Sequence, residues 1–145
     1  MWRGLLLAVL LAGCAQLAAC AQLPPTPQDL RAKKFEAVPG KAVIYLVRDS
    51  PDHNDVPAQI WLGDTLTLIT YPGTYYRWEV PPGRHRIAGF ASDIGSITID
   101  TAPGRIYFVQ QRLQPFLRYA LSHFQLVGEP EGRAAVTRAV LLVRP

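Results

Sequence analysis

Between residues 71 and 111, apolar and polar side chains alternate along the chain, and Pro-Gly pairs interrupt the alternation. Within residues 75–80, one face carries Tyr76, Trp78 and Val80, while the intervening side chains point to the opposite face. Each Pro-Gly pair suits the centre of a type II turn, because proline presets a negative φ and glycine accepts a positive one. The pattern therefore predicts half-buried antiparallel strands whose ends are fixed by tight turns.

Further strands are expected on both sides of this stretch. Residues 42–48 are apolar on both faces, which is typical of a central strand. Residues 58–62 and 65–69 flank Gly63-Asp64, which favours a two-residue hairpin turn. Pro115 is expected to break the chain there, so that the last strand of this series begins only at Ser122 and ends at Val127.

A helix is expected near each end of the domain. Thr26 can cap a short helix that starts at Pro27 and runs to about Phe35. A second helix is expected from about Pro130 into Leu141, with acidic residues beside its positive end. Many short strands at turn-limited spacing favour a sandwich or barrel. The predicted fold is therefore mainly β: a single small antiparallel β-sandwich in residues 38–145, similar to immunoglobulin and PEGA-type sandwiches, with a short N-terminal helix and a C-terminal helix.

The first twenty residues have the pattern of an export signal. Arg3 supplies a positive start, and residues 4–12 form an apolar run too short to cross a bilayer alone. Two segments then resemble the bacterial lipobox, an aliphatic residue and two small residues before a cysteine: Leu11-Ala12-Gly13-Cys14 and Leu17-Ala18-Ala19-Cys20. The resemblance to bacterial lipoproteins implies that one of these cysteines receives a diacylglyceryl group.

Leader length favours Cys20 as the lipidated residue, because Cys14 would leave a leader shorter than usual. An uncleaved membrane anchor reaching Ala21 is the alternative, which Gln16 within the apolar run weakens. We expect a signal peptide in residues 1–20 and a proline-rich tether with a short helix in residues 21–37. Alanine after either cysteine resembles lipoproteins of the outer membrane. The expected location is the bacterial cell envelope, with the domain tethered by acyl chains on the periplasmic side.

Composition narrows the chemistry of the folded part. The chain has 145 residues, enough for one globular domain after the leader. Both cysteines lie in the leader, which excludes a disulfide or a cysteine-bound metal from the domain. The net charge of +4 is mild and spread along the chain, unlike that of a nucleic-acid-binding protein. We therefore expect neither a cofactor nor a nucleic-acid partner.

Four segments resemble the successive blocks of DUF2846, a bacterial lipoprotein domain family of unknown function. They are GKAVIY (40–45), WLGD (61–64), PGRH (82–85) and GRIYFV (104–109). The resemblance covers residues 38–132. Its middle part is also similar to the PEGA-type module, a small β-sandwich of surface and envelope proteins. These motifs are structural, so the resemblance implies a sandwich fold and transfers no catalytic residue.

Potential metal ligands gather in one loop: Asp49, Asp52, His53, Asn54 and Asp55. The loop lacks the central glycine and the terminal glutamate of a calcium site, so we expect a solvated loop and assign no metal. Ser122 and His123 are adjacent on a strand and point to opposite faces, without the surrounding glycines of a nucleophile elbow. The carboxylates are scattered and offer no acid–base pair. We therefore expect a protein that is not an enzyme.

Arginines on the predicted strands form a candidate surface patch: Arg77, Arg84 and Arg86. On one exposed face they would contact anionic lipid head groups or glycans, and the alternative is an ordinary solvated face of a sheet. His85 shares its face with Ile87, which predicts a core histidine with a hydrogen-bond partner.

The expected function is that of a non-catalytic, lipid-anchored envelope lipoprotein that binds a protein partner or supports an envelope assembly. Exposed apolar strand edges would favour this function, because they can pair with another chain. The alternative is a small-ligand or glycan-binding lipoprotein, which would need a concave pocket lined by aromatic side chains. An envelope hydrolase would need titratable groups that converge in such a pocket.

Overall fold

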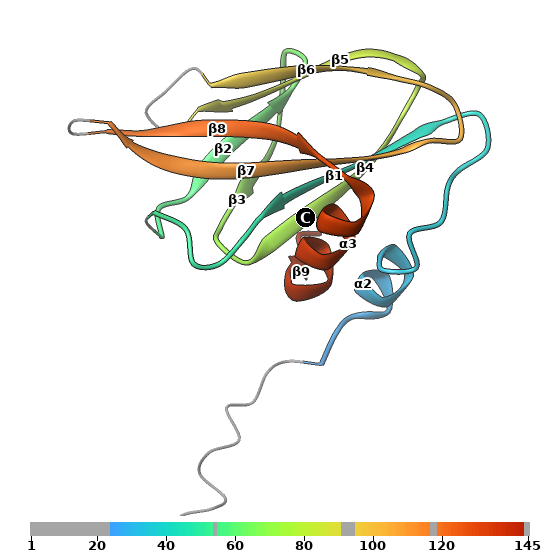
Figure 1. The fold of residues 1–145 in the computed structure, drawn as a ribbon, viewed down its shortest axis with the longest axis horizontal. Coiled ribbons are helices and arrows are strands. Elements are labelled where there is room, and N and C mark those ends of the chain that lie inside the picture. The colour runs from blue at the N-terminus through green and yellow to red at the C-terminus, as the bar shows by residue number, and fades with distance from the viewer. Residues whose placement is uncertain (1–23, 54, 91–94, 117–118, 144–145) are drawn as a thin grey trace, which may run out of the picture.

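A computed structural model describes residues 24–53, 55–90, 95–116 and 119–143. Two β-sheets face each other, and two helices cover the outer face of the larger sheet (Figure 1). This confirms the predicted β-sandwich with short helices. Within the described ranges, no helix has the length and apolar character needed to span a membrane. The predicted signal peptide, with Cys14 and Cys20, lies outside the described residues, as does Asn54.

The elements follow in chain order: α2 (Pro27–Ala32), β1 (Ala42–Arg48), β2 (Ala58–Leu62), β3 (Thr65–Thr70), β4 (Thr74–Val80), β5 (Gly83–Phe90), β6 (Ser96–Thr101), β7 (Ile106–Phe116), β8 (Tyr119–Val127), α3 (Glu129–Arg138) and β9 (Val140–Leu141). The larger sheet has the order β8-β7-β1-β4-β9, and the smaller has the order β3-β2-β5-β6. Most neighbouring strands are antiparallel, but β1 pairs with β7 and β4 with β9 in parallel. The larger sheet is therefore mixed, whereas the sequence pattern predicted antiparallel pairing.

The core between the two sheets contains the apolar face predicted from the alternation. Trp78 and Val80 of β4 are buried there against Ile44 of β1 and Ile87 of β5, with Tyr76 partly buried beside them. Burial of each large apolar side chain contributes about 1.5–3 kcal/mol to the free energy of folding. The alternating pattern thus drives the packing of one sheet on the other.

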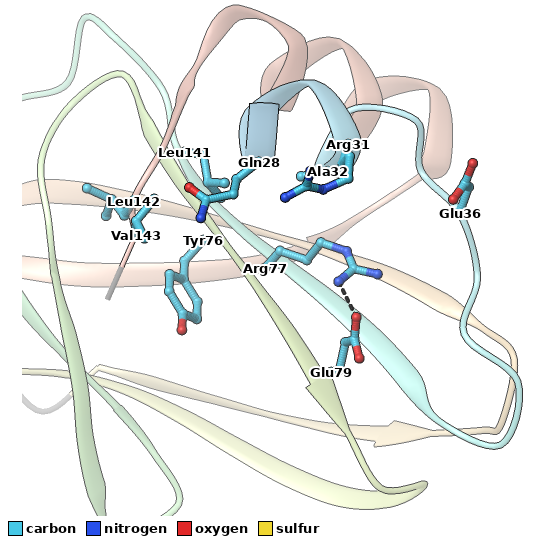
Figure 2. Close-up of a pocket in the computed structure, with 10 residues that line it drawn as sticks. All are labelled: Gln28, Arg31, Ala32, Glu36, Tyr76, Arg77, Glu79, Leu141, Leu142 and Val143. Carbon is cyan, nitrogen blue, oxygen red and sulfur yellow. Dashed lines mark hydrogen bonds and ion pairs between the residues drawn. The ribbon is translucent and has the colours of Figure 1, made fainter. Parts of the chain in front are cut away.

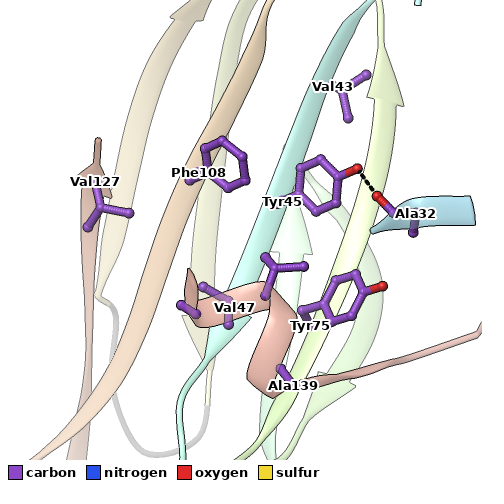
Figure 3. Packing of buried hydrophobic residues seen from close by; sticks show 10 residues of the cluster. Ala32, Val43, Tyr45, Val47, Tyr75, Phe108, Val127 and Ala139 are labelled. Atoms are coloured by element: carbon purple, nitrogen blue, oxygen red, sulfur yellow. Dashed lines mark hydrogen bonds between the residues drawn. The ribbon is translucent and has the colours of Figure 1, made fainter. Parts of the chain in front are cut away.

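A second core lies between the larger sheet and the helices. Tyr45 of β1, Tyr75 of β4 and Phe108 of β7 are buried there against Val136 of α3 (Figure 3). The rings of Tyr45 and Phe108 stack with their centroids 5.3 Å apart. Strand β1 is buried along its whole length because it contributes to both cores, which confirms the predicted central strand.

The predicted turn chemistry holds at most of the glycines. Gly40, Gly73 and Gly104 follow prolines and adopt φ values of 74°, 75° and 70°, as a type II turn requires. Gly63 has a φ of 62° in the hairpin between β2 and β3. Gly83 differs, because its φ of 138° lies away from the type II value and the residue opens β5 directly.

Both helices are shorter than predicted. Helix α2 ends at Ala32, and the predicted last residue, Phe35, has a positive φ of 54° that no α-helix accommodates. Helix α3 ends at Arg138, before the predicted end at Leu141. The chain after it is extended because Val140 and Leu141 pair with β4.

Strand β7 also differs from the prediction, since Pro115 does not break it. Residues 106–116 form one strand, in which Pro115 lies opposite Ala120 of β8. The backbone N–H of Leu113 points away from β8 and donates to the carboxylate of Asp52. The N–H that Pro115 lacks would point the same way, two residues further on, so the ladder to β8 loses no hydrogen bond.

Candidate functional site

A groove of about 520 Å³ lies between α2 and the outer edge of β4. Figure 2 shows α2 above the strand and the C-terminal segment at one end of the groove. Its lining includes Gln28 and Arg31 of α2, Arg77 and Glu79 of β4, and Leu142 and Val143. A groove of this size can hold a small molecule or a short stretch of polypeptide.

Asp29 holds α2 in place, and this helix forms one wall of the groove. Its side chain is buried, with the residue only 3% exposed. One carboxylate oxygen accepts hydrogen bonds from the hydroxyl of Tyr75 at 2.9 Å and from the backbone N–H of Leu141 at 3.1 Å. The other oxygen lies 2.9 Å from the ammonium of Lys33. Asp29 therefore joins α2 to β4 and β9, and Thr26 caps the same helix, as predicted.

A second set of polar contacts lies beneath α2. The hydroxyl of Tyr45 donates to the carbonyl of Ala32 at 2.6 Å and accepts from Nε of Arg77 at 3.2 Å. Arg77 also pairs with Glu79, and this hydrogen bond lowers the pKa of the Glu79 carboxyl. Burial raises the pKa of Tyr45, so its hydroxyl keeps its proton at neutral pH. Arg77 and Glu79, which line the groove, thus belong to a chain of paired polar groups that continues through the buried Tyr45 to Ala32 of α2.

Two charged side chains on the rim of the groove, Arg31 and Glu36, lack in the described part of the chain the ion pairing that Arg77 and Glu79 have. Arg31 and Glu36 are exposed, and no ion pair compensates either of them among the described residues. They are available to contact a bound molecule, whereas Arg77 and Glu79 already neutralise each other.

The outer edge of β4 is only partly occupied. Strand β9 pairs with it at Thr74 and Tyr75, and the N–H of Leu142 donates to the carbonyl of Tyr75 at 2.8 Å. Backbone groups alternate between the two sides of a strand, so Arg77 and Glu79 direct their N–H and C=O to the same side as Tyr75. Along the described chain no strand pairs with them on that side. The groove therefore borders an open sheet edge.

A second cavity, of about 510 Å³, borders the loop that contains the potential metal ligands. Asp52 pairs with Nε of the fully buried Arg48 at 2.7 Å and accepts hydrogen bonds from the backbone of His53 and Leu113. Asp49 pairs with Arg138 at 2.9 Å. The loop is therefore anchored by ion pairs at Asp49 and Asp52, while Ser50, Pro51, His53 and Asp55 are exposed to solvent, as predicted for a solvated loop. In the described part of the chain, no cluster of three His, Cys, Asp or Glu side chains could hold a metal ion.

The structure brings together only part of the predicted arginine patch. Arg84 and Arg86 are both exposed on β5 in the smaller sheet, where Arg84 lies 3.5 Å from Asp100. Arg77 belongs to β4 in the larger sheet and is half-buried in the groove beneath α2. The three side chains therefore do not share one surface.

The histidines and Ser122 can also be placed. His85 is half-buried near the start of β5 and has a partner, the carbonyl of Pro81, at 2.7 Å from its Nε2. It thus has the predicted partner, although the hydrogen bond lies at the surface and not in the core. Ser122 is buried and His123 is exposed, so they lie on opposite faces as predicted.

Sequence reasoning missed the residues that build the groove. The sequence predicts a helix that starts at Pro27 and a central strand over residues 42–48, but it does not indicate the hydrogen bonds that Asp29 and Tyr45 make to other elements. The available signal was the pair of tyrosines on strands, because a buried tyrosine hydroxyl requires a hydrogen-bond partner. Their partners could not be named from sequence, since Asp29 and Tyr75 are 46 residues apart.

No family model matches the chain. The chain is 24% identical over 131 residues to an uncharacterized protein of Haemophilus influenzae, and the alignment covers 88% of this chain and 78% of that protein. The similarity extends through most of both chains, but at this identity it assigns neither a family nor a function. The fold and the site define a small β-sandwich with a groove at a sheet edge.

Proposed function

We propose that this protein is a lipid-anchored module of the bacterial cell envelope, facing the periplasm, that binds a protein partner in the groove beside β4. The observation that carries the proposal is the open edge of β4 along a groove of about 520 Å³. An open edge offers unpaired backbone groups to another chain, and the groove supplies side-chain contacts next to them.

The lipid anchor rests on the sequence. The two lipobox segments support lipidation at Cys20, or at Cys14, and two or more acyl chains would hold the protein stably on a membrane. The alanine after each cysteine favours the outer membrane. The resemblance of four segments to DUF2846 supports the same location, because that family consists of bacterial lipoprotein domains.

A small ligand or a glycan is the second candidate for the groove. The observation that favours it is the polar rim, where Gln28, Arg31 and Glu36 could hydrogen-bond to sugar hydroxyls. Tyr76 adds one aromatic side chain to the lining. A protein partner accounts better for the open backbone edge, since a sugar offers no ladder of amide groups.

Site-specific photocrosslinking in the bacterium that makes the protein tests the proposal. A photoreactive residue would replace Arg31 or Leu142 in the groove, and Thr98 on the exposed face of β6 would serve as the control position. We expect one protein to be captured from both groove positions and not from Thr98. Equal capture at Thr98, or no protein adduct from the groove, would contradict the proposal. A glycan or small-molecule adduct would favour the second candidate.

A further inference from the structure

We propose that the partner supplies an extended segment that joins the larger sheet as an additional strand on β4, in line with β9. This inference rests on the proposed function and specifies how the groove is used. An added strand would be recognised through backbone hydrogen bonds. Binding should therefore depend on backbone N–H groups of β4 as well as on side chains.

Strand β9 already pairs with part of this edge. Two residues of β9 lie parallel to Thr74 and Tyr75, which shows that the edge of β4 accepts a strand. The described chain leaves residues 76–80 without a neighbour on that side. Their outward backbone groups, those of Arg77 and Glu79, would continue the hydrogen-bond ladder that ends at the carbonyl of Tyr75.

The groove beside this edge has the shape that an added strand requires. Helix α2 lies along one side of the open edge, held there by Asp29 and by the hydrogen bond between Tyr45 and Ala32. Alternate side chains of an added strand would face α2, where Ala32 and Leu141 offer apolar contacts. The C-terminal segment closes the groove at one end, and Pro81 ends β4 at the other. The available edge, residues 76–80, suits a guest strand of about 16 Å.

The charged side chains on the rim of the groove flank the open edge of β4 and leave its backbone accessible. Arg31 and Glu36 are exposed above the groove, while the side chains of Arg77 and Glu79 bond to each other. A guest strand can therefore approach without separating a buried ion pair. Its own charged side chains can pair with Arg31 or Glu36 and set its register.

The test compares Glu79→Pro with Glu79→Ala in the full chain, by crosslinking from position 31. Both variants lack the carboxylate that pairs with Arg77, so the alanine variant is the reference. Only proline also removes the N–H that faces the open edge, and this N–H takes no part in the ladder to β1. We expect Glu79→Pro to capture about tenfold less partner than Glu79→Ala, the effect of one lost backbone hydrogen bond.

The outcomes separate this inference from the proposed function. If both variants capture the same partner equally, strand addition is wrong and the proposed function stands. If the protein with the photoreactive residue at position 31, and with Glu79 unchanged, captures no protein at all, the proposed function itself fails. Capture of a second copy of this chain would overturn the assignment to a different partner protein.

Hydrogen exchange gives a second measurement that does not require the proline variant to fold. In the complex of the full chain with the captured partner, the amides of Arg77 and Glu79 should exchange at least about tenfold more slowly than in the protein alone. The amides of Tyr76 and Trp78 face β1 and should change little, which makes them the internal control. Unchanged exchange at Arg77 and Glu79 would overturn the inference.

Discussion

Replacing Asp29 with alanine is expected to detach α2 from the sheet and to destabilise the whole domain. The substitution leaves the hydroxyl of Tyr75 and the N–H of Leu141 buried without their acceptor. Each orphaned donor costs about 1–3 kcal/mol, while Lys33 can turn to water and to the carbonyl of Ala139. The expected loss is therefore about 2–6 kcal/mol, a large part of the roughly 5–15 kcal/mol that stabilises a typical domain.

Urea unfolding of the purified full chain in detergent, followed by tryptophan fluorescence, would measure this loss. The control is the Asp29→Ala, Tyr75→Phe double variant, which removes one of the two orphaned donors. Its loss should be about 1–2 kcal/mol smaller than the sum of the two single losses, because the two side chains bond directly. A loss below about 1 kcal/mol for Asp29→Ala would refute the reasoning, since it would mean that the buried donors find other partners.

Three further predictions concern pH, packing and the anchor. Burial and then the Asp29 carboxylate raise the pKa of Tyr75 above its ordinary value of 10.0. The protonated Tyr75 hydroxyl stabilises the fold fully below about pH 10, the pKa of an unfolded tyrosine. Above that pH, the free energy of unfolding should fall by about 1.4 kcal/mol per pH unit, and Tyr75→Phe should reduce this slope. Gly132→Ala should lower stability by about 1–3 kcal/mol in urea unfolding, because the added methyl would overlap Cβ and Cγ of Phe108. Cys20→Ser should remove the acyl mass from the intact protein and Cys14→Ser should leave it, while the reverse result would assign the lipid to Cys14.

The fold could be predicted to the level of a sandwich because its main signals are local. Alternation at Trp78 and Val80 and the glycines of the turns depend on residues only a few positions apart. The strand order could not be predicted in the same way. The parallel pairing of β1 with β7 joins residues such as Val43 and Ile106, which lie far apart in the sequence, and no local pattern specifies that choice.

Local signals also failed where the tertiary environment changes their meaning. Proline usually ends a strand, yet Pro115 lies where the missing N–H would face no neighbouring strand. Gly132 was not recognised as important, although its lack of a side chain lets α3 approach Phe108 closely. In both cases a distant segment decides: β1 ends opposite Gln111, which leaves that side of Pro115 without a strand in the described chain, and β7 places Phe108 against α3.

The candidate site was the least predictable part because no single segment contains it. The hydrogen bond between Asp29 and Leu141 spans 112 residues. The groove exists only when α2, β4 and the C-terminal segment meet. The sequence instead predicts a candidate surface patch that includes Arg84 and Arg86, which are exposed on β5 and do not line the groove.

The proposed anchor and the proposed groove constrain each other through α2. This helix begins at Pro27 and lines the groove with Gln28 and Arg31, so a chain that leads from a lipid at Cys20 would enter the domain beside the groove. If Cys20 carries the lipid, the chain between Cys20 and Pro27 can span at most about 25 Å even when fully extended. The groove must then stay near the membrane surface. A partner of the proposed groove would then have to belong to the same membrane, or to reach its surface, and the proposed envelope assembly meets this condition better than capture of a freely diffusing molecule does.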